Sequence, residues 1–171
     1  MFQRYGQFPG YTIQEKLDSP RSYERFLATE NSDPRNWCVI RCLNKELAGT
    51  AELRLCYQDA CRHYAHYHLD GLFPVREMGM SRAYGFYIAY AYEFSVLSIG
   101  EISALCQHDK MRISPAFMMS VLLDAVRILD VAHANRLEHY GVLPPYIMLV
   151  PNGDVYVKGF VETAMRRRYH F

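Results

Sequence analysis

Few side chains in this sequence occur in the types and spacings that catalysis or metal binding requires. His63, His66 and His68 lie close together, but spacings of three and five residues do not place all three on one helical face. This pattern favours a partly exposed, aromatic-rich helix face over a metal site. Cys106 and His108 combine a nucleophile with a base, yet they are too close in sequence to form a working pair, and no orienting acid stands out. The sequence therefore predicts neither a metal centre nor a cysteine-histidine enzyme.

The second half of the chain predicts two helices followed by a β-hairpin. Ser98 and Glu101 fit a capping box that opens a short helix ending near residue 106. Ser114 and Pro115 mark the start of a longer helix that reaches about residue 136. The stretch IMLV at 147–150, the turn PNGD at 151–154 and the stretch VYV at 155–157 then indicate a hairpin, with Asp154 serving as turn chemistry.

The first half predicts five strands and one helix. Apolar and β-branched runs place strands at residues 11–17, 23–29, 37–43, 73–78 and 83–94, the last two joined by residues 79–82. A helical stretch covers about residues 45–69, with a weak point at Gly49 and Thr50 where the helix can begin. The expected fold is α+β, with an antiparallel sheet and one helix over residues 1–94 and a helical lobe over residues 95–171.

This order of elements, together with several local sequences, resembles the protein kinases from about residue 11 to residue 160. WCVIR at 37–41 resembles the third-strand V-A-I-K motif, with Arg41 at the phosphate-pairing lysine. Residues 73–75 and 86–94 resemble strands four and five running into the hinge. Residues 132–144 resemble the helix leading into the catalytic loop, and 147–160 resemble the hairpin that carries the metal-binding motif. The resemblance implies a five-stranded antiparallel N-lobe sheet with one helix, plus a truncated helical C-lobe that ends after this hairpin.

The resemblance also implies that the catalytic positions are degenerate. The kinase H-R-D motif reads H-Y-G, so Gly141 replaces the catalytic base, and the magnesium-binding asparagine falls on Tyr146. The D-F-G motif reads G-F-V, so Gly159 replaces the second metal ligand. The segment at 18–23 that matches the glycine-rich loop contains no glycine. Because Mg²⁺ prefers oxygen ligands and phosphoryl transfer depends on it, we expect no kinase activity, no bound metal and no cofactor.

A nucleotide-binding alternative stays open at this point. Adenine could stack in a residual cleft near Glu93 and Phe94 without help from a metal. Arg41 could meet a phosphate or could pair with a helix carboxylate near Asp59 or Ala60. The chain would then be a nucleotide or small-ligand sensor.

The long helix predicted at 115–136 carries the main prediction about partners. It is apolar nearly all round, which is normal for a buried helix. The chain ends at Phe171, and the helices that follow in kinases and cover this helix are missing, so we expect it to bury itself against a second copy, another protein or the tail at 163–171. The interface candidates are Phe117, Met118, Val121, Leu122, Val126 and Leu129.

Composition excludes several other classes of function. The chain has 171 residues, of which 50% are hydrophobic, and a formal net charge of +1, which argues against a nucleic-acid binder held by bulk charge. It has neither a signal peptide nor eighteen consecutive apolar residues, so we expect no membrane span. Five cysteines without a CxxC spacing indicate a reducing, cytoplasmic location.

The sequence thus predicts a pseudokinase that acts as a regulatory scaffold and forms a homodimer, with the ligand sensor as the alternative.

Overall fold

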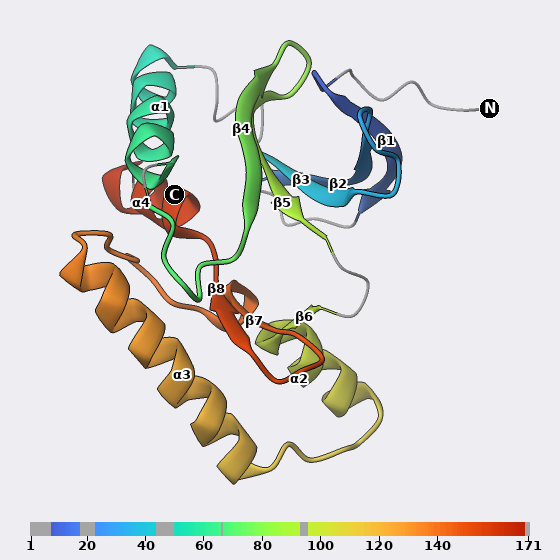
Figure 1. Cartoon of the computed structure of the whole chain (residues 1–171), viewed down its shortest axis with the longest axis vertical. Helices are drawn as coiled ribbons and strands as arrows, with labels where there is room; N and C mark the ends of the chain where they lie inside the picture. The colour runs from blue at the N-terminus through green and yellow to red at the C-terminus, as the bar shows by residue number, and fades with distance from the viewer. Residues whose placement is uncertain (1–7, 18–22, 44–49, 66, 93–95, 170–171) are drawn as a thin grey trace. The chain divides into compact units, whose positions relative to one another are not determined.

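The computed structural model describes residues 8–17, 23–43, 50–65, 67–92 and 96–169 (Figure 1). They form two compact units, one of residues 1–59 with 74–93 and the other of residues 60–73 with 94–171. The sequence-based division at residue 94 placed 60–73 in the first lobe, whereas the structure groups this segment with the second unit. One reason is the parallel β-bridge between Leu72 and Val157.

The first unit is built on a five-stranded sheet. Its strands are β1 (Tyr11–Leu17), β2 (Tyr23–Glu30), β3 (Trp37–Leu43), β4 (Val75–Ser81) and β5 (Gly85–Ala91). They pair antiparallel in the order β1-β2-β3-β5-β4. This arrangement confirms the predicted antiparallel sheet.

Helix α1 (Ala51–Ala65) begins beside the sheet. Of the predicted helix at 45–69, residues 67–69 are not helical, and residues 45–49 and 66 lie outside the described residues. Thr50 Oγ1 accepts a hydrogen bond from the Leu53 amide at 3.2 Å, so the helix begins at the predicted weak point. Tyr57 fixes the helix to β5, because its hydroxyl donates to the Tyr87 carbonyl at 2.7 Å and its ring stacks on Phe86 at 4.4 Å. The opposite face of the sheet buries an aromatic and aliphatic core that includes Phe8, Phe26, Ile40 and Tyr87.

The connection predicted between the fourth and fifth strands is wrong at Gly79. Residues 79–81 continue β4, and the turn lies between Ser81 and Gly85. A Cβ at Gly79 would stand 2.7 Å from the Tyr87 ring, so this glycine makes room for an aromatic side chain on the neighbouring strand. The sequence analysis interpreted Gly79 as a turn residue, whereas in the structure it lies within a strand and allows the Tyr87 ring to pack closely.

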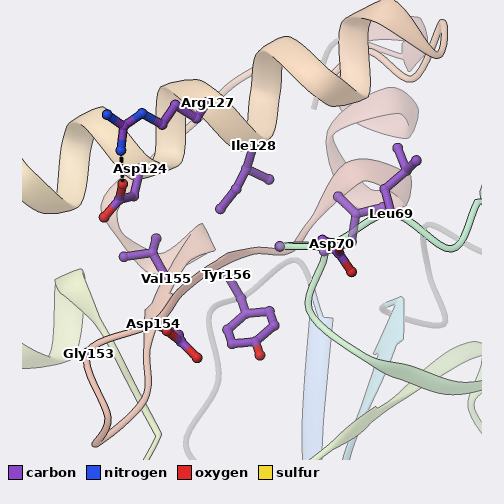
Figure 2. A pocket seen from close by; sticks show the side chains of 11 residues that line it. Leu69, Asp70, Asp124, Arg127, Ile128, Gly153, Asp154, Val155 and Tyr156 are labelled. Carbon is purple, nitrogen blue, oxygen red and sulfur yellow. Dashed lines mark hydrogen bonds and ion pairs between the residues drawn. The ribbon is translucent and has the colours of Figure 1, made fainter.

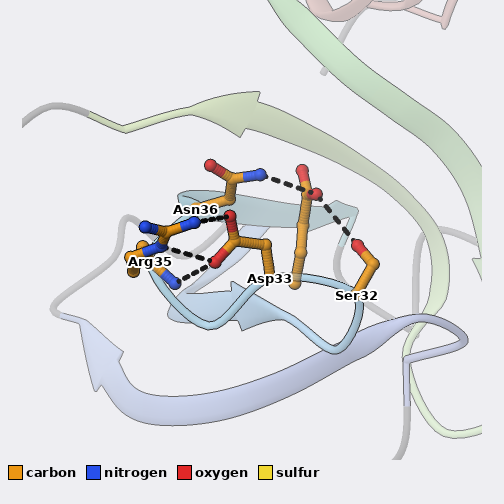
Figure 3. Close-up of polar contacts among 5 residues, drawn as sticks. Ser32, Asp33, Arg35 and Asn36 are labelled. Atoms are coloured by element: carbon orange, nitrogen blue, oxygen red, sulfur yellow. Dashed lines mark hydrogen bonds and ion pairs between the residues drawn. The ribbon is translucent and has the colours of Figure 1, made fainter.

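A polar network closes the turn between β2 and β3 (Figure 3). The Asp33 carboxylate accepts hydrogen bonds at 3.1 Å from the backbone amide and the guanidinium of Arg35. These bonds lower the pKa of Asp33. Glu30 accepts from Ser32 and from the Asn36 amide, and the Glu30 amide donates to the Asn36 carbonyl at 3.0 Å. The turn therefore sets the register of β3, the strand that carries Arg41.

The second unit contains a small sheet and most of the helices. The sheet has the order β6-β7-β8, formed by β6 (Leu97–Ser98), β7 (Ile147–Leu149) and β8 (Val155–Val157). The helices are α2 (Ile99–His108), α3 (Pro115–Ala134), the short 3₁₀ helix η2 (Pro144–Tyr146) and α4 (Phe160–Tyr169). The predicted hairpin and both predicted helices are present, whereas α4 replaces the expected tail.

The predicted helix starts differ in their capping. Ser98 and Glu101 form the full capping box, with the Ser98 hydroxyl accepting from the Glu101 amide at 3.2 Å and the Ser98 amide donating to the Glu101 carboxylate at 2.7 Å. Ser114 has the extended backbone of a cap residue but makes no capping hydrogen bond with its side chain. The start of α3 therefore depends on Pro115 in the first turn.

Helix α3 packs on β8 through one narrow face, and Figure 1 shows it running alongside that strand. Val121, Ala125 and Ala132 are the buried residues of this face. Among the residues that the structure describes, no helix is both long enough and apolar enough to cross a membrane.

Candidate functional site

The residues that match the kinase catalytic loop and metal-binding motif lie just before β7 and just after β8. The Tyr146 amide donates to the Leu143 carbonyl at 2.8 Å, which forms η2, and the Lys158 amide donates to the Tyr146 carbonyl at 2.9 Å. At the tip, Asn152 accepts from the Asp154 amide at 3.0 Å and donates to its carboxylate at 2.7 Å. Asp154 is therefore turn chemistry, as predicted.

The Tyr146 ring fills the space that a side chain at position 159 would need. Gly159 is buried and has a φ of +97°, a conformation that side chains rarely adopt. A Cβ at this position would meet the Tyr146 ring at Cδ1, only 2.4 Å away. Tyr146 itself is only 3% exposed. The two positions at which the resemblance implies metal ligands are thus filled by an aromatic ring and by the glycine that admits it.

These residues do not fit a magnesium ion. Mg²⁺ requires oxygen ligands in near-octahedral geometry, and Gly159 offers no side chain while the buried Tyr146 turns ring carbons toward it. Within the described part of the chain, no three histidine, cysteine, aspartate or glutamate side chains come together as a metal cluster either. No chemical step through a metal can be derived for this site.

His139 lies beside this pair and is held neutral. Its Nε2 is 2.9 Å from the Lys158 carbonyl, and its Nδ1 accepts from the Gly141 amide at 3.4 Å, so the geometry requires the proton on Nε2. The ring makes edge contacts with Tyr146 at 5.4 Å and with Phe160 at 4.6 Å. Burial lowers the pKa of His139, and the hydrogen bond to the Lys158 carbonyl and the charge of Glu162 only partly oppose the shift.

Gly141 differs from Gly159 in its surroundings. It is exposed, and a Cβ added there would meet no atom within 4 Å. An aspartate at the position of the kinase base would therefore be accommodated, whereas one at the metal position would not. The two positions that the resemblance implies are degenerate therefore differ in the space around them.

Helix α4 continues directly from Gly159 and is tied back to it. Both the amide and the hydroxyl of Thr163 donate to the Gly159 carbonyl at 2.9 Å. Phe160 is buried next to Tyr64, with ring centroids 6.0 Å apart. At the other end, the Arg167 guanidinium lies 4.3 Å from the Tyr140 ring, over the H-Y-G segment. The segment at 160–169, for which the sequence predicted no helix, therefore packs on the segment that matches the catalytic loop.

In the first unit, Arg41 lies within β3 and is only 8% exposed. Its guanidinium carbon is 4.2 Å from the centroid of the Tyr23 ring, in cation-π geometry. Asp59, the predicted helix carboxylate, is exposed on α1. Residues 18–22, which match the glycine-rich loop, and the hinge candidates Glu93 and Phe94 lie outside the described residues.

The outward side of α3 carries an apolar stripe. Met119, Leu122, Leu123 and Val126 are 60%, 44%, 51% and 60% exposed, and on a helix with 3.6 residues per turn they form one stripe outside the buried face, with Leu122 at the edge nearest to it. We call these four residues the outer stripe. Of the interface candidates, Leu122 and Val126 belong to it. Met118 and Leu129 are half-buried, and Phe117 is 39% exposed elsewhere on the helix.

One interface candidate does not fit this role. Val121 is 3% exposed because it points into the core of the second unit, so it cannot line an interface as the unit stands. Met119 and Leu123 were missed by sequence reasoning, and counting 100° per residue finds both only once the structure shows which alanines are buried.

Of the histidines considered for a metal site, His63 makes local contacts and His68 is exposed. His63 Nε2 lies 3.3 Å from the Arg136 carbonyl, and its ring makes an edge contact with Tyr67 at 5.2 Å. His66 lies outside the described residues.

Comparison with known proteins identifies the fold. No protein-family model matches the sequence, and no curated protein matches it. The structure is similar to the crystal structure of the PknI kinase domain of Mycobacterium tuberculosis, with a TM-score of 0.76 at 19% identity, covering 94% of this chain and 62% of that one. A doubly substituted variant of the same domain gives a TM-score of 0.75 at 21% identity, covering 94% and 64%.

The chain therefore has a protein kinase-like fold, as the sequence predicted, and spans less than two thirds of the length of the kinase domains it matches. Sequence identities near 20% establish the fold alone. The function has to be argued from the side chains of this chain.

Proposed function

We propose that this chain is a catalytically inactive kinase-fold protein that works by binding other proteins, as a regulatory scaffold or adaptor. The observation that carries the proposal is the packing of the Tyr146 ring against Gly159. A catalytic site that has merely lost a ligand would leave space or a solvated gap. Here the buried Tyr146 ring packs directly against Gly159, so the implied metal positions leave no open space between them.

Phosphoryl transfer gives the physical reason why this packing matters. The reaction depends on metal ions and cationic groups that position the phosphates and neutralise their charge. Gly159 and Tyr146 supply no carboxylate or amide oxygen at the implied metal positions, and Gly141 supplies no base. Restoring a carboxylate at Gly159 alone would not restore the site, since the Tyr146 ring would still fill it.

The proposal is tested by thermal-shift titration with ATP, in the presence and absence of Mg²⁺. We expect no increase in melting temperature under either condition. Mg²⁺-dependent stabilisation would contradict the proposal. Stabilisation by ATP that is independent of Mg²⁺ and is removed by Arg41→Leu would instead support the nucleotide sensor.

We further propose that the partner of the outer stripe is a second copy of this chain. From the exposed fractions, the four side chains present roughly 400 Å² of apolar surface, within the range of the largest patch on a typical monomer. This is about half of the roughly 800 Å² that each partner buries in a standard interface, and flanking side chains would supply the rest. Asp124 and Arg127 form an ion pair on α3. By the helix period this pair lies beside the stripe and does not interrupt it.

Molar mass from light scattering after size exclusion tests this pairing over a range of protein concentrations. We expect a dimer that Leu122→Asp converts to a monomer, while Leu55→Asp, an exposed leucine on α1, leaves it dimeric. A wild-type protein that stays monomeric at all concentrations would exclude self-association. A dimer that dissociates only when ATP is added would favour the sensor.

A further inference from the structure

The second unit has a groove whose lining includes three residues of α3, none of them in the outer stripe. Figure 2 shows the groove from close by. Its volume is about 600 Å³, and its walls are the loop at 69–72, one side of α3 and the turn between β7 and β8. Figure 2 shows Ile128 pointing from α3 into the space between the other two walls. Together with Leu72 and Val155, which are 8% and 7% exposed, it gives the groove an apolar floor.

The groove is preformed by main-chain contacts. The Val157 amide donates to the Gly71 carbonyl at 2.8 Å, and the Phe73 amide donates to the Val157 carbonyl at 2.9 Å. Gly71 has a φ of +82°, and a Cβ there would stand 2.4 Å from Ile128, so the loop backbone lies directly against the helix. A binding surface whose walls are already fixed loses little conformational entropy when it is occupied.

The rim of the groove is acidic. Asp70, Asp124 and Asp154 come from the three different walls, and Arg127 is the one cation among the lining residues. Arg127 is paired with Asp124 at 2.8 Å. The remaining rim charge is negative in a chain whose net charge is +1. An apolar floor between separated carboxylates is complementary to an aliphatic side chain that has cations on both sides.

We propose that this groove binds an extended protein segment in which an aliphatic residue is flanked by lysine or arginine. The aliphatic side chain lies on Ile128 and Val155, and the flanking cations face Asp70 on one side and Asp154 on the other. The inference rests on the proposed binding function and deepens it, because it gives the chemistry of a partner. It is independent of self-association, which uses the outer stripe.

The probe is a short synthetic peptide with a leucine flanked by lysines, titrated into isotopically labelled protein and followed by amide NMR shifts. We expect saturable shifts at Gly71 and Gly153, weakening as salt is added. Asp70→Asn combined with Asp154→Asn should weaken binding about fivefold, in line with the modest strength of exposed ion pairs. The matched control is Asp130→Asn, an exposed carboxylate on α3 that does not line the groove, and its affinity should equal that of the wild type.

Two control peptides separate the charge from the apolar contact. Replacing the lysines with glutamates should abolish the shifts, and replacing the leucine with serine should weaken them. The proposal is overturned if the shifts map away from the groove, if Asp130→Asn weakens binding as much as the double variant, or if the serine peptide binds equally well. Such a failure would leave the ATP titration unchanged, so it would be distinguishable from a failure of the proposed inactivity.

Discussion

Replacing Gly159 with alanine tests whether Tyr146 fills the implied metal position. The substitution adds a single methyl group, which would stand 2.4 Å from the Tyr146 ring. It also places a side chain at a φ of +97°. Gly153 provides a matched control, because its φ is +94° and a Cβ there would meet no atom within 4 Å. The two variants share the backbone strain and differ in the steric overlap.

The expected magnitudes follow from this comparison. A side chain in the left-handed region lowers the free energy of unfolding by about 1–2 kcal/mol, and this applies to both variants. The unfolded state loses similar conformational entropy in both, so that effect cancels. Overpacking in a core adds about 1–3 kcal/mol. We therefore expect Gly159→Ala to reduce the free energy of unfolding by about 1–3 kcal/mol more than Gly153→Ala does.

Urea denaturation followed by circular dichroism is the assay. The sole tryptophan, Trp37, lies in β3, so its fluorescence is recorded separately as a reporter for the first unit. In a Tyr146→Ala background the overlap disappears, and the excess cost of Gly159→Ala should disappear with it. Equal costs for Gly159→Ala and Gly153→Ala in the wild-type background would refute the reasoning.

Two further predictions concern the pH dependence of stability and a helix cap in the second unit. Because burial lowers the pKa of His139 in the folded state, its contribution to stability is fully present above the unfolded pKa of about 6.5 and is lost as the pH falls from there through the folded pKa. Urea denaturation is measured at steps between pH 5 and pH 7.5. The free energy of unfolding should depend less steeply on pH for His139→Gln than for the wild type, and identical slopes would contradict the neutral assignment of His139. Ser98→Ala removes the capping box and should lower the free energy of unfolding by about 1 kcal/mol, whereas Ser114→Ala, whose side chain makes no capping bond, should cost clearly less in the same urea titration.

The parts of the fold that local rules determine could be predicted from the sequence. The capping box at Ser98, the turn at Asn152 to Asp154 and the strands of the first sheet depend on neighbouring residues, and all are present. The order of these elements carried the kinase-like fold, which the structural similarity supports. Local chemistry and order along the chain were sufficient for this level of description.

Features that depend on distant residues could not be predicted. Gly79 was taken for a turn because only the structure shows the Tyr87 ring above it. Helix α4 was missed because its arginine-rich sequence resembles a solvated tail, while its buried residues, such as Phe160 and Met165, gain their value from contacts within the second unit. The burial of Val121 also depends on contacts within the second unit, so the sequence alone did not predict it.

The candidate site was predicted in its residues but not in its physics. Sequence comparison identified Gly141, Tyr146 and Gly159 as substituted positions and treated all three as losses. The structure separates them, because Gly141 faces open space whereas Gly159 lies against the Tyr146 ring. At two positions that share a site, the sequence has one glycine and one large aromatic residue. This pairing of a small with a large residue could have suggested that Tyr146 packs against Gly159.

The most direct test of the central claim is paramagnetic broadening of amide NMR signals by Mn²⁺-ATP. Mn²⁺ can take the place of Mg²⁺ at oxygen sites and broadens the signals of nearby nuclei. Broadening near Asp70 or Asp154 would report attraction of the cation to the acidic groove and is scored separately. If the implied metal position is filled by the Tyr146 ring, the amides of Tyr146 and Gly159 will keep their line widths as Mn²⁺-ATP is added. Selective, saturable broadening of those two amides would contradict the account.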